Sequence, residues 1–126
     1  MAKNALERLR EICLVMPEVA EKVSHGEPTF WVRERMFAMF ANAGNHHGGG
    51  RDAVWCKADH LTQDVLVGRN PERCFIPPYV GPSGWVGVYL DRRPIWKDVT
   101  ERLRESWRLV APKRLLAESM TRGELI

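Results

Sequence analysis

The sequence contains no hydrophobic run close to the roughly 20 residues that a membrane-spanning helix needs, so we expect no membrane segment. Its N-terminus leads directly into an amphipathic pattern and lacks the apolar core of a signal peptide, which predicts a cytoplasmic protein. Cysteine is scarce and odd in number, at three. Because Cys13, Cys56 and Cys74 each lie among apolar residues, we expect reduced, buried thiols and no disulfide framework.

The motifs of the common enzyme classes are also missing. No Walker loop, dinucleotide fingerprint, carboxylate pair or activated nucleophile is present, which predicts a protein that is not an enzyme and binds no cofactor. The string His47-Gly48-Gly49-Gly50 matches the oxyanion loop of some esterases. That loop requires a nucleophile elbow, and Gly81-Pro82-Ser83-Gly84 has the wrong spacing and precedes a strand. Three glycines at a hairpin tip explain the string without a hydrolase.

A metal site is the second chemical alternative. Its candidate ligands are His46, His47, Cys56, Asp59 and His60. Structural zinc sites pair their ligands at short, regular spacings, and these residues do not. The pattern favours surface histidines and a core thiol, and therefore no metal.

Length and composition fit one domain over residues 1–126, with 44% hydrophobic and 28% charged residues. We expect a monomer. Apolar periodicity and turn residues predict an α+β fold in the order one helix, three strands, one helix, two strands, one helix. The sheet is expected to be antiparallel, with about five strands and all helices on one side. The predicted helices cover residues 4–16, 60–67 and 95–110, and the predicted strands 29–32, 36–40, 53–57, 74–76 and 85–90.

Three segments are predicted to form neither a helix nor a strand. Residues 18–22 are interpreted as an acidic linker and residues 113–116 as a short final turn. Residues 43–51 are interpreted as a flexible glycine-rich loop. Strand and helix periodicity predicts that Phe30, Trp85, Trp96 and Trp107 are buried within reach of one another.

The net charge is only +3, but it is unevenly distributed. Residues 92–116 include eight basic and three acidic residues, so this window carries +5 and the rest of the chain −2. Within the helix, Glu101–Arg104 and Glu105–Arg108 have the spacing of local ion pairs. The cations outside the helix are better candidates for phosphate contacts. They are Arg92, Arg93, Lys113 and Arg114.

Four further residues are candidates for a site. Lys57 follows a predicted strand and Tyr79 precedes the glycine turn, so each could line a concave nucleic-acid-binding surface with Arg92 or Arg93. His25 and Glu27 belong to a polar block interpreted as a turn at 25–28, and are candidate ligand contacts.

Several separated blocks resemble one family in the right order. They are Leu9-Arg10-Glu11-Ile12-Cys13-Leu14, His25-Gly26-Glu27-Pro28-Thr29-Phe30, Gly84-Trp85-Val86-Gly87-Val88 and Val110-Ala111-Pro112-Lys113-Arg114-Leu115. Together they resemble the MmcQ/YjbR family over nearly the whole chain. The resemblance implies an antiparallel sheet covered by helices on one side, of a double-wing type. The family is often labelled DNA-binding by analogy with that fold.

Three functions are therefore open. The resemblance implies a non-enzymatic domain that binds DNA through its basic C-terminal elements. The alternative is a protein-interaction module that uses the open sheet face or an edge strand. A small-molecule site under the glycine-rich loop is the third.

Overall fold

The structure, a computed structural model, describes residues 3–123. Its helices are α1 (Ala5–Cys13), α2 (His60–Arg69), α3 (Trp96–Val110) and α4 (Lys113–Arg122), with a 3₁₀ turn η1 (Gly81–Ser83). Its strands are β1 (Val19–Ser24), β2 (Glu27–Val32), β3 (Arg35–Ala41), β4 (Ala53–Cys56), β5 (Cys74–Phe75) and β6 (Val86–Tyr89). Within the described residues, no helix is both long and apolar enough to cross a bilayer.

The six strands form one antiparallel sheet in the order β1-β2-β3-β4-β6-β5. The first four strands are neighbours in sequence and in space, joined by hairpins. The turn between β1 and β2 consists of His25 and Gly26, both with positive φ (54° and 78°). Two residues of positive φ give the backbone twist that a tight hairpin favours. Glu27 and Pro28, expected in this turn, instead begin β2.

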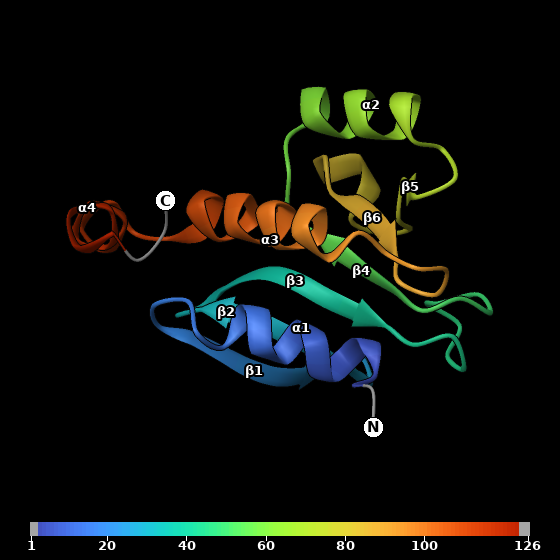
Figure 1. Cartoon of the computed structure of the whole chain (residues 1–126), viewed down its shortest axis with the longest axis horizontal. Coiled ribbons are helices and arrows are strands. Elements are labelled where there is room, and N and C mark those ends of the chain that lie inside the picture. The colour runs from blue at the N-terminus through green and yellow to red at the C-terminus, as the bar shows by residue number, and fades with distance from the viewer. Residues whose placement is uncertain (1–2, 124–126) are drawn as a thin grey trace.

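One face of the sheet carries the helices (Figure 1). α1 lies over β1 and β2, α3 runs across the central strands, and α2 lies at the end of the sheet formed by β5 and β6. Trp107 of α3 is fully buried in this layer with Phe30 of β2, and its indole nitrogen donates to the Pro17 carbonyl oxygen at 3.0 Å. This large hydrophobic core on the helix side explains why a chain of this size folds without disulfides.

Side-chain caps fix the starts of two helices. Asn4 and Glu7 form a reciprocal capping box at α1, and the Asp59 carboxylate accepts from the backbone of Thr62 at α2. These bonds satisfy amide donors that have no partner inside a helix. The two helices therefore begin where these caps lie.

The three cysteines are free and buried, as predicted. Burial raises the pKa of the Cys56 thiol to about 12, and burial likewise raises the pKa values of Cys13 and Cys74. These thiols are therefore protonated and unreactive at neutral pH.

The α+β class and the antiparallel sheet are confirmed, but the predicted count of about five strands was too low. Residues 18–22, which include most of β1, were interpreted as a linker because they show no clear pattern of buried apolar residues. In the structure, Val23 of this strand is largely exposed. All six of its residues pair with β2, so backbone hydrogen bonds rather than side-chain burial define this edge strand. The predicted final turn likewise continues into α4, where Leu115 and Ser119 face inward one turn apart.

The predicted cluster of aromatic residues was also partly wrong. Phe30 and Trp107 share the helix-side core, and Trp96 packs at its margin. Trp85 belongs to the other face of the sheet, with Trp55. Alternation along a strand explains the difference, because Val86 points toward the helices and its neighbour Trp85 must point away.

Candidate functional site

The helix-free face of the sheet contains an apolar pocket of about 560 Å³, here called the outer pocket. Its floor is formed by side chains that alternate away from the helices, chiefly Met39 and Trp55, which are paired across β3 and β4. Three chain segments form its walls: the β1–β2 turn, the glycine-rich loop and the connection from β5 to η1. The lining residues are His25, Met36, Met39, His46, His47, Trp55, Tyr79 and Val80.

A buried carboxylate holds the glycine-rich loop over this face. The side chain of Glu27 is only 1% exposed, and its two oxygens accept from the backbone N–H of Asn42 at 3.0 Å and the Asn45 amide nitrogen at 2.7 Å. Both donors belong to the loop that follows β3. A hydrogen bond to an ionised group is among the stronger kinds in proteins. Glu27 therefore positions the loop that carries the two histidines.

His47 lies between this carboxylate and the pocket. Its Nδ1 atom is 3.6 Å from the nearer oxygen of Glu27, the side chain is 7% exposed, and Nδ1 makes no hydrogen bond. The imidazole ring also contacts Trp55 edge-on, with ring centroids 5.7 Å apart, and Tyr79 at 6.3 Å. An unpartnered polar atom in a buried side chain is unusual and makes His47 a candidate site residue. The prediction that both histidines are surface residues was wrong for His47.

Backbone geometry of the loop explains its glycines. A Cβ at Gly48 would lie 2.2 Å from the carbonyl oxygen of Asn42, so no side chain fits at that position. Gly49 and Gly50 both have positive φ. Asp52 closes the loop by accepting from the backbone N–H of Ala43 at 2.7 Å. The run of glycines is therefore the means by which the loop turns tightly enough to place His47 against the sheet.

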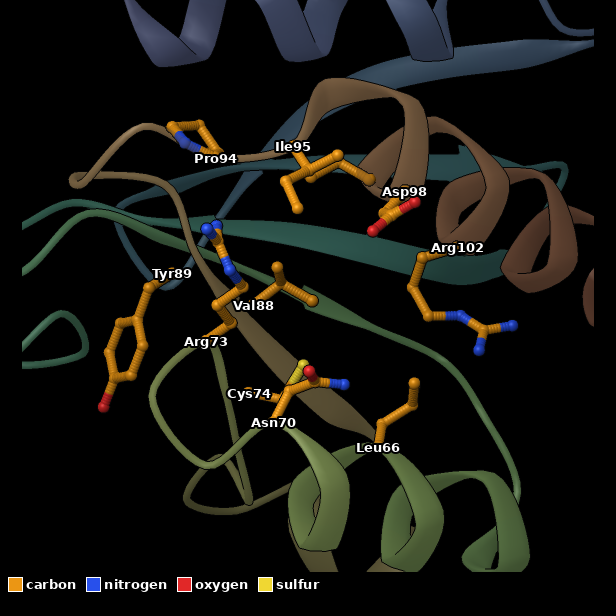
Figure 2. A pocket seen from close by; sticks show the side chains of 11 residues that line it. Leu66, Asn70, Arg73, Cys74, Val88, Tyr89, Pro94, Ile95, Asp98 and Arg102 are labelled. Carbon is orange, nitrogen blue, oxygen red and sulfur yellow. The ribbon is translucent and has the colours of Figure 1, made fainter.

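A second, smaller cavity of about 190 Å³ lies on the helix side, between α2, α3 and β6. Figure 2 shows Asp98 and Arg102 projecting from α3, with Asn70 and Cys74 on the opposite wall. The Nε atom of Arg102 is buried without a hydrogen-bond partner. This cavity is smaller than most small-molecule sites, which are about 300–1,000 Å³, whereas the outer pocket falls within that range.

The predicted nucleic-acid residues lie at separate places. Arg92 and Arg93 are exposed in the connection before α3, and Lys113 and Arg114 are exposed in the first turn of α4. The two pairs are thus at opposite ends of α3 (Figure 1). Lys57 follows β4 on the helix side, where its carbonyl oxygen accepts from the hydroxyl of Ser106 at 2.7 Å.

The predicted ion pairs of α3 are present. Arg104 pairs with Glu101 at 3.3 Å, and Arg108 pairs with Glu105. The charges along the middle of this helix are therefore partly neutralised, as the sequence spacing predicted.

Three of the sequence-predicted residues do meet in one place. His25 and Tyr79 line the outer pocket, and Glu27 lies directly behind it. The two methionines, Trp55 and Val80 were not predicted as site residues. The available signal was alternation, since Met39 and Trp55 each stand one residue away from side chains that face the helices.

The described residues contain no group of three or more histidine, cysteine, aspartate or glutamate side chains arranged to hold a metal ion. The absence of a structural metal stays a prediction. Chelator treatment should leave the melting temperature unchanged, and zinc or iron whose removal unfolds the protein would contradict it.

The sequence model of the YjbR family matches residues 14–109. The chain belongs to the YjbR family. This match spans β1 to the last turn of α3 and includes every residue of the outer pocket. A search of curated proteins found no match.

Among solved structures, the crystal structure of Deinococcus radiodurans protein DR2400, which has a DUF419 domain, is similar to this chain. The two share 22% sequence identity, with a TM-score of 0.70 over 86% of this chain and 79% of the other. At this sequence identity, the similarity shows only that the two proteins share a fold.

Proposed function

We propose that this YjbR-family domain binds a small molecule in the outer pocket and acts by binding rather than by catalysis. The observation that carries the proposal is the outer pocket itself, whose wall includes the largely buried imidazole of His47 on a loop that Glu27 holds in place. Pockets that combine apolar walls with a few fixed polar groups are typical of ligand sites.

The shape of the site favours a small molecule over a partner protein. The loop after β3 and the segment before η1 enclose the pocket from two sides, whereas a strand or helix needs a long open groove. We further propose a monomer in the cytoplasm, where three free, buried cysteines would stay reduced.

The test uses the methionine methyl groups, which are sensitive NMR probes. Met36 and Met39 line the outer pocket, Met16 is buried on the helix side, and Met120 is exposed on α4. Against a panel of small aromatic and apolar molecules, we expect shifts of the Met36 and Met39 methyl signals only. The variant His47→Ala should weaken binding at least about tenfold, since it removes an imidazole ring from the wall of the pocket.

The matched control is His60→Ala, because His60 lies on α2 and does not line the outer pocket. This variant should bind the same molecules as the wild type. If no molecule of the panel shifts Met36 or Met39, or if Met16 and Met120 shift equally, the proposed binding site is wrong.

DNA binding is the second candidate, and one observation favours it. Among the ion pairs of residues 3–123, none includes Arg92, Arg93, Lys113 or Arg114. The 15 residues of α3 separate the two pairs by about 22 Å. A duplex lying along this helix could contact phosphates at both ends.

Such binding should be weak and strongly salt-dependent. With about four phosphates contacted, the logarithm of affinity should fall with the logarithm of salt concentration at a slope of about −3.6. Reversing Arg92, Arg93, Lys113 and Arg114 to glutamate should abolish binding, and Lys97→Ala should change it little. Fluorescence anisotropy of a labelled duplex over a salt series measures both effects. No binding even at low salt would exclude this candidate.

A further inference from the structure

The outer pocket is lined by aromatic rings and thioethers, and no lysine or arginine is among the described residues that line it. Its lining includes the rings of Trp55, Tyr79, His46 and His47 and two thioethers. Aromatic rings present a negative face, and the sulfur of methionine is strongly polarisable. The side chains that enclose the ligand therefore favour positive charge.

The charged side chain nearest to the outer pocket is the negatively charged carboxylate of Glu27. Glu27 is buried directly behind His47, and the groups that satisfy its two oxygens are neutral amides of Asn42 and Asn45. These donors carry no net charge, so they do not cancel the charge of the carboxylate. Since screening by water is weak around a buried group, the charge also acts on the pocket.

An anion would meet unfavourable conditions in the same place. The two buried nitrogen atoms without a hydrogen-bond partner, His47 Nδ1 and Trp55 Nε1, lie beneath the surface of the pocket, and the first of them already faces Glu27. The other hydrogen-bonding groups of the lining are the Tyr79 hydroxyl and the rings of His25 and His46, and no lysine or arginine is among the described lining residues. A ligand anion would therefore lie close to the carboxylate without a direct cationic partner.

We propose that the ligand of the outer pocket is an organic ammonium ion with apolar substituents, held over the faces of Trp55 and Tyr79 and attracted by Glu27. This inference rests on the proposed ligand-binding function and specifies its chemical class. Organic ammonium groups are recognised in this way by aromatic residues in other proteins.

Three probes of similar shape and different charge test it. They are phenyltrimethylammonium, which is a cation, tert-butylbenzene, which is neutral, and benzenesulfonate, which is an anion. Titrations followed by the Met36 and Met39 methyl signals give a dissociation constant for each. We expect the cation to bind about tenfold more tightly than the neutral probe, and the anion to bind most weakly.

Two variants separate charge from shape. Glu27→Gln should reduce several-fold the preference for the cation, measured as the ratio of the cation's affinity to the neutral probe's affinity. The ratio is the readout because any loosening of the loop by the lost acceptor affects both probes. Tyr79→Leu should reduce the same preference about threefold, because it removes one ring from an exposed position and keeps an apolar side chain. Tyr89→Leu is the matched control, since Tyr89 lies on the same face but does not line the outer pocket, and should leave the preference intact.

The outcomes distinguish the two proposals. If the neutral or anionic probe binds as tightly as the cation, the ammonium inference is wrong and the outer pocket remains a ligand site. If none of the three probes shifts Met36 or Met39, the proposed function fails and the inference fails with it.

Discussion

Replacing Trp107 with alanine should lower the free energy of unfolding by about 3–5 kcal/mol. The indole ring is fully buried between α3 and the sheet, so its removal leaves a large cavity. The substitution also deprives the Pro17 carbonyl oxygen of its hydrogen-bond donor, since the indole nitrogen donates to it at 3.0 Å. Urea unfolding followed by circular dichroism measures the loss.

Leu109→Ala provides the control on the same helix. Leu109 is exposed, so its replacement should change the free energy of unfolding by less than about 0.5 kcal/mol. A loss below about 1 kcal/mol for Trp107→Ala would mean that α3 does not pack on the sheet through this face.

Replacing Glu27 with alanine should cost about 3 kcal/mol in the free energy of unfolding, the second-largest effect we expect. The carboxylate is almost fully buried and accepts from two donors of the glycine-rich loop. Without it, the backbone N–H of Asn42 and the side chain of Asn45 lose their acceptors. The loop that forms one wall of the outer pocket should loosen as a result.

Hydrogen exchange distinguishes this local effect from general unfolding. In Glu27→Ala, amides of residues 42–51 should exchange faster, while those of α1 and α3 keep their relative protection. Glu34→Ala, at an exposed position in the next hairpin, should leave both exchange and stability unchanged. Unaltered exchange in the loop of Glu27→Ala would show that Glu27 does not hold it.

The elements that sequence patterns predicted well are those whose stability depends on side chains. α3 has an apolar stripe at helical spacing, and its buried residues include Val99, Leu103 and Trp107. β1 escaped prediction because it is defined by backbone pairing with β2, a long-range relation that leaves little trace in side-chain polarity. The helical continuation of α4 was missed for a similar reason, as only Leu115 and Ser119 are buried there.

The site was predictable only in part, because its residues come from five segments of the chain. His25, Glu27 and Tyr79 were proposed as functional, yet nothing in the sequence placed His25 and Tyr79 together. His47 looked like a loop histidine among glycines. Its burial depends on the hydrogen bonds that Asn42 and Asn45 donate to Glu27, which lies 15 and 18 residues earlier in the chain. The amino-acid composition of the loop does not reveal such contacts.

The central claim, that the helix-free face carries the ligand site, is tested most directly by intermolecular nuclear Overhauser effects. A small aromatic cation such as phenyltrimethylammonium, bound to methyl-labelled protein, should show contacts to the methyl groups of Met36, Met39 and Val80. Contacts instead to Leu66 and Val88, which line the smaller cavity on the helix side, would contradict the claim and move the site to the opposite face of the sheet.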